Sequence, residues 1–574
     1  MDQHTTDTGT VRADEVSART AIDEVWQIVS HALLVDSEPD GRIELPDVGF
    51  AAIEERSLAG ADLVARIDGI DASDLPADVA LSLSVARHLA AGWSREKDWY
   101  WLAFDPMGVG FFSMFAPSAY SGGFLLTHVH QALTVVSLTD EADVAQHLDL
   151  INDYARLIRQ FTERTSGQAE RGIHMPAQQL ESAVALVAGL KSGGVTALCA
   201  VAERSADTVS VADRDRIDAR VASLVEPAYD ELVALLSDPA YAASAPDSVG
   251  IGSYPGGDSI YAELVRMHTT LELSAQEVHE RGVARMARIE SEMRELLAEV
   301  GFAGSSAEYL AALAEDPEWC ATTDEGIAAH FQRYIDRFAP EAENYFGRLP
   351  EAGYGVEPLP AAVEKSMTFG YYAPPQTHQD RGVYRFNGAN LSETSLANIA
   401  ALNYHELVPG HHLQFALQRE TTDVHPLRQH AEATAFTEGW AEYAARFAGE
   451  IGMYRTPQER FGRLMMEAFL TSRLVVDTAM NALGWSLERG RDYMREHSFM
   501  GATEIDSETL RYSCDLPAQA LAYKLGDDFL FELREDLRAT KSDDFRIADF
   551  HDAVLRAAGL PLPIVADYVR SELA

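Results

Sequence analysis

Three imidazoles and one carboxylate stand within eight residues in the segment His405-Glu406-Leu-Val-Pro-Gly-His411-His412. Imidazole and carboxylate together are a ligand set suited to zinc. In the common zinc-hydrolase pattern His-Glu-x-x-His, the two histidines lie one helical turn apart and reach one ion, while the glutamate points at the attacking water. The segment therefore predicts a zinc centre for hydrolysis, with Glu406 as its general base.

The spacing of this segment differs from that pattern. Pro409 occupies the position of the second ligand, and the next histidines, His411 and His412, follow six and seven residues after His405. On an unbroken helix they would be displaced by about 9 to 10.5 Å along the axis, too far to share an ion. Proline and glycine at 409 and 410 favour a break that returns a later histidine toward His405. We prefer His411 as the second ligand and keep His412 as the alternative.

A second segment, Thr437-Glu438-Gly-Trp-Ala-Glu442-Tyr443, supplies two carboxylates four residues apart, which share one face of a predicted helix over about 430–449. A short connection favours antiparallel packing against the preceding helix. Glu438 could then be the third ligand, and Glu442 could accept a hydrogen bond that holds a ligand histidine in place. Taken alone, such carboxylates are more often solvated charges on a helix face.

Residues farther along the chain could complete the chemistry. The phenol of Tyr523, or else Tyr512 or His412, could donate a hydrogen bond to a tetrahedral oxyanion. Arg511 and Lys524 could hold a substrate carboxylate, and with Tyr512 they form the predicted substrate-binding group. The alternatives are core packing for the tyrosines and a buried ion pair for the two cations.

The elements that must position these residues are mostly helices. Apolar residues recur three and four positions apart in 21–35, 144–164 and 211–225. Ser274 and Glu277 form a capping-box pattern that opens a long charged helix to Val300. The segment 395–418 is predicted to be a helix interrupted once, at Pro409-Gly410.

Strand patterns concentrate between 366 and 386, where 367–372 and 382–386 flank the turn-rich segment 374–380. We predict a small hairpin or a pair of edge strands beside the active-site cleft, where an edge could pair with an extended peptide. A hairpin that only covers the core is equally compatible. The predicted fold class is mainly α, a large multi-helix assembly with this small β element.

A chain of 574 residues exceeds one ordinary core. The segment 242–257, with Pro246 and several glycines, is the best boundary. We predict an amino-terminal helical domain over 1–245 and a helical catalytic domain over 258–574, with one interleaved assembly as the alternative.

Composition limits the partners and the compartment. The chain has 46 Lys and Arg against 90 Asp and Glu, a formal charge of -44, which repels phosphate backbones and anionic lipids. We therefore expect no nucleic-acid partner and no membrane. Three scattered cysteines fit a reducing compartment, and residues 1–20 have no apolar signal core. These features predict a cytoplasmic protein.

The motifs together resemble a known family. The string His-Glu-x-x-Pro-Gly-His-His at 405–412, Glu-Gly-Trp-Ala-x-Tyr at 438–443, and the stretch from Arg511-Tyr512 to Gly526 are similar to the bacterial family DUF885. Segments 371–387 and 550–563 are similar to it as well. That family resembles, at a distance, helical zinc peptidases of the thimet oligopeptidase and angiotensin-converting-enzyme type.

The resemblance implies zinc ligands at His405, at His411 or His412, and at Glu438, with Glu406 as general base. It implies hydrolysis of peptide bonds in short peptides. Two alternatives remain: a zinc amidohydrolase acting on a small non-peptide amide or an amino-acid conjugate, and a non-catalytic binding protein of peptidase ancestry.

Overall fold

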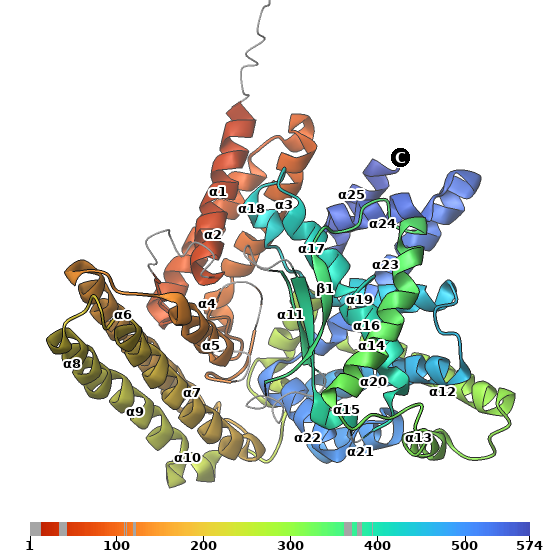
Figure 1. The fold of residues 1–574 in the computed structure, drawn as a ribbon. Helices are drawn as coiled ribbons and strands as arrows, with labels where there is room; N and C mark the ends of the chain where they lie inside the picture. The colour runs from red at the N-terminus through yellow and green to blue at the C-terminus, as the bar shows by residue number, and fades with distance from the viewer. Residues whose placement is uncertain are drawn as a thin grey trace, which may run out of the picture.

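The computed structural model describes residues 13–33, 43–107, 110, 112–118, 122–360, 370–375, 381–392 and 394–574. In these ranges the chain is mainly helical, with one small three-stranded sheet (Figure 1). The mainly α prediction is therefore confirmed. The long helices of residues 141–236 lie side by side at the left of Figure 1. The sheet lies near the centre, between the amino-terminal helices and the carboxyl-terminal ones.

The amino-terminal helices include the predicted ones. The pattern in 144–164 lies inside a longer helix, and that in 211–225 covers a helix and the π-helical turn Val221–Val225 that follows it. The helices of this half are α1 (Ala13–Leu33), α2 (Phe50–Asp68), α3 (Ala77–Trp93), α4 (Glu96–Trp99), α5 (Gly123–Ala132), α6 (Glu141–Glu170), α7 (Ala177–Arg204), α8 (Val211–Arg220), α9 (Glu226–Leu236), α10 (Pro239–Ser244) and α11 (Gly257–Thr269).

The carboxyl-terminal helices carry the candidate chemistry. The capping box at Ser274 is present, with its hydroxyl accepting from the Glu277 amide and the Glu277 carboxylate accepting in return. These helices are α12 (Ala275–Glu299), α13 (Ser306–Ala314), α14 (Asp324–Phe338), α15 (Gly388–Ser392), α16 (Ile399–Glu406), α17 (His411–Glu420), α18 (Pro426–Gln429), α19 (Thr434–Glu450), α20 (Pro457–Ala482), α21 (Leu487–His497), α22 (Ala502–Leu510), α23 (Ala522–Lys541), α24 (Ile547–Arg556) and α25 (Leu562–Glu572).

The sheet has the strand order β1-β3-β2, with β1 (Gly353–Pro358) parallel to β3 (Arg381–Phe386) and β2 (Gly370–Ala373) antiparallel to it. The predicted antiparallel pair is present, whereas 366–369 and 376–380 lie outside the described residues. The sequence did not predict β1, because two glycines and a terminal proline give it a low strand propensity.

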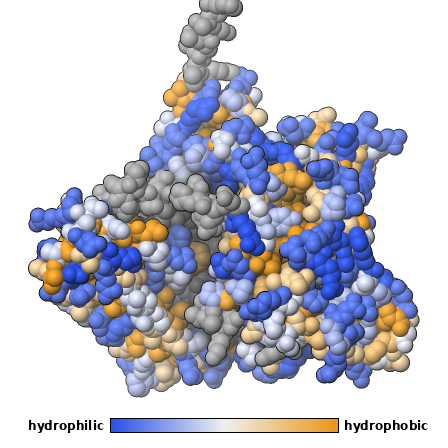
Figure 2. Space-filling view, viewed as in Figure 1, coloured by the Kyte–Doolittle hydropathy of each residue, from blue (hydrophilic) through white to orange (hydrophobic). Residues whose placement is uncertain are grey.

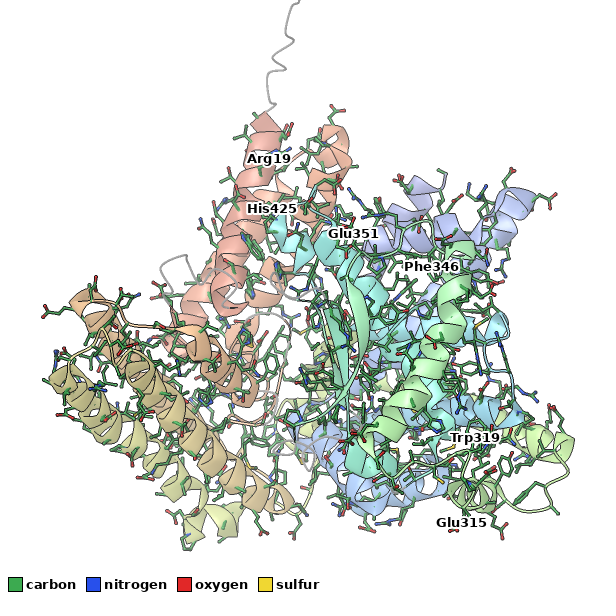
Figure 3. The ribbon with its side chains drawn as sticks, viewed as in Figure 1. Arg19, Glu315, Trp319, Phe346, Glu351 and His425 are labelled. Carbon is green, nitrogen blue, oxygen red and sulfur yellow. The ribbon has the colours of Figure 1, made fainter. Side chains whose placement is uncertain are left out.

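Two large hydrophobic clusters hold the fold together, and each draws residues from both halves of the sequence. One joins buried residues of α1 and α3 to those of α16, α19 and α24. On the surface near that cluster, His425 Nε2 lies 3.0 Å from Asp23 Oδ1, and Figure 3 shows His425 beside α1. The segment 242–257 is also packed, since the Gly250 amide donates to the Ser513 carbonyl at 3.0 Å. The division at 245 and 258 stays a prediction.

The surface in view is largely hydrophilic. Hydrophilic residues cover much of the face in Figure 2, with apolar residues in separate small groups.

Within the described ranges, α7 alone is long and apolar enough to cross a membrane by length and composition, with a mean hydropathy of 1.7. One such helix is weak evidence, because core helices of soluble proteins meet the same criterion. The expectation of no membrane partner stays a prediction.

Candidate metal centre

The predicted break at Pro409-Gly410 is present and separates α16 from α17. The loop folds back over the end of α16 so closely that a Cβ on Gly410 would lie 1.8 Å from the His405 carbonyl oxygen. Only glycine fits there, since every other residue carries a Cβ. The Trp440 indole donates to the Pro409 carbonyl at 3.0 Å, which ties the loop to α19.

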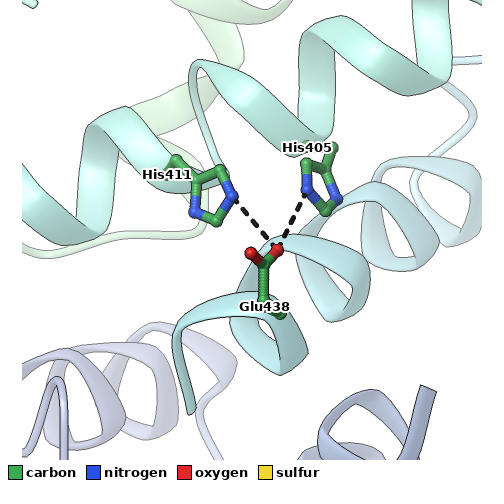
Figure 4. A group of neighbouring side chains, drawn as sticks. All are labelled: His405, His411 and Glu438. Carbon is green, nitrogen blue, oxygen red and sulfur yellow. Dashed lines mark ion pairs between the residues drawn. The ribbon is translucent and has the colours of Figure 1, made fainter. Parts of the chain in front are cut away.

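This loop brings three side chains together from α16, α17 and α19 (Figure 4). His405 Nε2 lies 3.5 Å from Glu438 Oε2, and His411 Nε2 lies 3.4 Å from the same oxygen. The three donor atoms are all within 4.8 Å of one another. His405 and His411 are buried, each 7% exposed.

The group has the donor set and the spacing that a metal ion needs. Bonds of about 2.0 to 2.1 Å in tetrahedral zinc sites place neighbouring ligand atoms roughly 3.3 Å apart, close to the two distances given above. Glu438 Oε2 is buried and has no hydrogen-bond partner within the described part of the chain. A buried carboxylate oxygen without a donor is costly unless a cation satisfies it. These residues therefore could hold a metal ion.

Glu442 holds the ring nitrogen of His405 that does not face Glu438. Its Oε1 accepts from His405 Nδ1 at 2.9 Å, which directs Nε2 at the candidate site. Its Oε2 accepts from Arg463 Nη1 at 3.0 Å and from Lys524 Nζ at 3.3 Å. These two cations outweigh the burial of the carboxyl and hold the pKa of Glu442 well below its usual range. Glu442 is therefore a fixed, ionised acceptor.

The same carboxylates act on His405. Burial lowers the pKa of His405, but the neighbouring carboxylates of Glu438 and Glu442 outweigh it and raise the pKa to about 10. The imidazole therefore sits in a strongly negative environment. A divalent cation bound between these groups would neutralise more of this negative charge than a single proton does.

His412 lies outside this group, although it is adjacent to His411. Its Nδ1 is 2.8 Å from the Tyr372 hydroxyl and its Nε2 is 3.1 Å from the Ala352 carbonyl oxygen. Both ring nitrogens are thus occupied by neighbours on β2 and just before β1. Burial lowers the pKa of His412 to about 4, so the ring is neutral.

Glu406 lies next to the candidate ligands and faces the same cavity. It is 8% exposed, and burial raises the pKa of its carboxyl against the opposing charges of His405 and His411. A carboxylate with a raised pKa takes up a proton more readily than an ordinary glutamate.

Tyr523 also faces the candidate site. Its ring is stacked against the His405 ring, with 6.3 Å between centroids and 9° between planes. The Arg473 guanidinium also lies over the phenol ring, 4.7 Å from its centroid. Burial and the charge of Glu438 raise the pKa of Tyr523 to about 12, so the hydroxyl keeps its proton and can donate it.

A cavity of about 810 Å³ is lined by the three candidate ligands, by Glu406 and by Tyr523. Its walls include Glu406, His411 and Tyr523 on one side, and Gln179 and Leu186 of α7 on another. The volume falls within the range of roughly 300 to 1,000 Å³ that small-molecule sites occupy. The amino-terminal helices therefore help to enclose the candidate site.

The predicted substrate-binding residues occupy different environments. Arg511 lines the cavity and donates to Gln519 at 2.6 Å. Tyr512 is fully buried and donates to Glu508. Lys524 is fully buried too, with Nζ 2.6 Å from Asp527. Tyr512 and Lys524 do not line the cavity, so a buried network describes them better than contact with substrate.

Several residues of the site had no signal in the sequence. Arg463 reaches Glu442 from α20, Arg473 reaches Tyr523 from the same helix, and Glu432 lines the cavity before α19. Isolated arginines and glutamates in helical segments look like ordinary surface charges. Tertiary structure alone distinguishes them, through the packing of α20 against α16 for the two arginines and through the cavity wall for Glu432.

With the geometry established, sequence comparison gives the family. Residues 35–569 match the family described as "Bacterial protein of unknown function (DUF885)". The chain belongs to the DUF885 family. A search of the curated proteins found no match. Membership therefore confirms the resemblance of the motifs and leaves the activity open.

Two solved structures share the DUF885 fold over nearly the whole chain. A "putative lipoprotein" from Colwellia psychrerythraea has a TM-score of 0.85 at 24% identity, covering 98% of this chain and 100% of that one. A "putative lipoprotein of unknown function" from Shewanella oneidensis has a TM-score of 0.75 at 16% identity, covering 97% and 99%. At these identities the likeness shows the fold alone.

These neighbours overturn the cytoplasmic prediction, because proteins of the same fold bear the name lipoprotein. The prediction relied on three cysteines and on a polar segment at residues 1–20. The three thiols are indeed free. Free thiols, however, indicate the absence of a disulfide framework and do not specify a compartment, and residues 1–12 lie outside the described part of the chain.

Proposed function

We propose that this DUF885 protein is a zinc-dependent hydrolase that cleaves amide bonds in short peptides. The observation that carries the proposal is the position of Glu406. It stands beside three converging ligand atoms, in the wall of a cavity of substrate size. Metal ligands alone could serve a structural site, whereas a buried carboxylate with a raised pKa next to them suits a general base.

His405, His411 and Glu438 would hold the ion. Zinc in that position would acidify water and polarise a carbonyl group. Glu406 takes the proton of the attacking water on its carboxylate and delivers it to the nitrogen of the leaving amine. The Glu442 carboxylate keeps the proton of His405 on Nδ1, so that Nε2 stays available as a ligand atom.

Tyr523 supplies the complementary donor. Its hydroxyl keeps its proton at neutral pH and stands at the cavity wall near Glu438. A hydrogen bond from this phenol stabilises the negative charge that develops on the carbonyl oxygen. Arg473, packed over the ring, makes that donor more acidic than burial alone would leave it.

The test pairs zinc analysis with peptide hydrolysis. Wild-type protein is expected to hold about one zinc per chain and to cleave members of an unbiased peptide mixture, read by mass spectrometry. Glu406→Gln keeps the size of the side chain and removes its basicity, so it should retain zinc and lose roughly 10²- to 10⁴-fold in rate. Undiminished hydrolysis by this variant would exclude Glu406 as the base. No hydrolysis of any peptide by zinc-loaded wild type would exclude the peptidase assignment.

A further inference from the structure

The carboxylate of Glu432 has no role in the mechanism above. It precedes α19, lines the 810 Å³ cavity and is accessible to solvent within it. No hydrogen bond or ion pair joins it to another residue of the described chain, and only burial and the more distant charges of Arg419 and His411 act on it. The side chain is exposed to the solvent of the cavity, and desolvation by the surrounding protein raises the pKa of its carboxyl.

A carboxylate that faces a cavity without a protein partner is available to a cationic group of a ligand. A ligand that fills the cavity displaces the water around this carboxylate, and a hydrogen-bonded positive charge on the ligand offsets that cost. Arg419 forms no ion pair with it, and the Arg419 Nε atom is itself buried without a partner among the described residues. The cavity is therefore complementary to a ligand that brings its own positive charge to Glu432.

The opposite charge is concentrated in another part of the same wall. Arg473 and Arg511 both line the cavity near Tyr523, and they share the Glu508 carboxylate. A positively charged group is therefore disfavoured beside these two guanidinium groups, and Glu432 attracts it together with Glu406 and Glu438, which also line the cavity.

A second cavity begins where Glu432 stands. It measures about 230 Å³ and shares Glu432 and Thr434 with the walls of the larger cavity. Much of its wall is apolar, including Leu89 and Trp93 of α3 and Met267 of α11. A peptide whose ammonium group reaches Glu432 would have space beside it for an apolar side chain.

Resting on the proposed function, we infer that Glu432 binds the free α-ammonium group of the substrate, so that the enzyme acts on short peptides with an unblocked amino end. Hydrolysis then occurs at a bond close to that end, because Glu432 and His411 line one cavity. A charged hydrogen bond of this kind corresponds to a preference of about 10- to 100-fold for a free over a blocked amino end.

The test compares two pools of short peptides with identical sequences, one with free amino ends and one N-acetylated, and measures kcat/KM for both. Wild type should prefer the free pool by about 10- to 100-fold. Glu432→Gln should lower the rate on the free pool to that on the acetylated pool and leave the acetylated rate within about twofold. Glu315→Gln removes the same charge from an exposed site far from the cavity (Figure 3) and should behave as wild type.

Binding without turnover separates this inference from the proposed function. The zinc-loaded Glu406→Gln variant is dialysed to equilibrium against both pools, and the amount of each retained peptide is measured by mass spectrometry. The inference is supported if Glu406→Gln retains the free pool preferentially and the double variant, which also carries Glu432→Gln, does not. This result would hold even if wild type cleaves nothing. The inference is overturned if wild type cleaves the two pools at equal rates and Glu406→Gln retains them equally. Peptide hydrolysis by wild type would in that case still support the proposed function.

Discussion

Replacing Glu442 by Gln tests the link between the buried ion network and the candidate metal centre. The carboxylate accepts from His405 on one oxygen and from Arg463 and Lys524 on the other. The glutamine amide has only one oxygen, and Arg463 and Lys524 will both donate to it. The NH2 group then faces His405 Nδ1 and favours the tautomer whose proton is on Nε2, the atom that should bind the metal.

The expected magnitude follows from this change of tautomer. Loss of the residue that supports a ligand histidine typically weakens metal binding by about 10- to 100-fold, which is roughly 1.4 to 2.8 kcal/mol. The variant also removes a negative charge from two buried cations, so stability should fall by about 3 to 5 kcal/mol. These two effects must be separated.

Asp527→Asn is the matched control. It removes a buried carboxylate 2.6 Å from Lys524 and leaves the contact between His405 and Glu442 intact. Zinc affinity is measured by competition with a chromophoric chelator, and stability by urea unfolding. Both variants should unfold at lower urea concentration, and only Glu442→Gln should bind zinc more weakly. Unchanged affinity in Glu442→Gln, or an equal loss in both variants, would refute the argument from the tautomer.

Two further substitutions test the loop between α16 and α17. His411→Gln should weaken zinc binding by more than the roughly 10- to 100-fold expected of a supporting residue, whereas His412→Gln should leave it near wild type, as chelator competition would show. A reversed ranking would make His412 the ligand. Gly410→Ala places a methyl group against the His405 carbonyl and should cost at least about 1 to 3 kcal/mol in urea unfolding, with loss of zinc. Gly189→Ala, in an open position on α7, should be neutral or stabilising, and equal stability of both variants would contradict the proposed crowding.

Much of the helical fold could be predicted from local patterns. The periodicity in 144–164 and the capping box at Ser274 each depend on residues close in sequence, and the structure places helices at both. β1 escaped prediction because its pairing with β3 is parallel and non-local, and its own residues favour strands weakly. The same limitation applies to the arrangement of α20, which carries Arg463 and Arg473 to the site.

For the candidate site, sequence determined which chemical groups are present and where the helix must break. It placed His405, Glu406 and Glu438 in one candidate site, since imidazole and carboxylate at this spacing favour a metal. Tertiary structure brought His411, and not His412, to Glu438, because the two side chains leave α17 in different directions. It also placed Glu432 in the walls of two adjoining cavities, since only the packing of distant helices can form them.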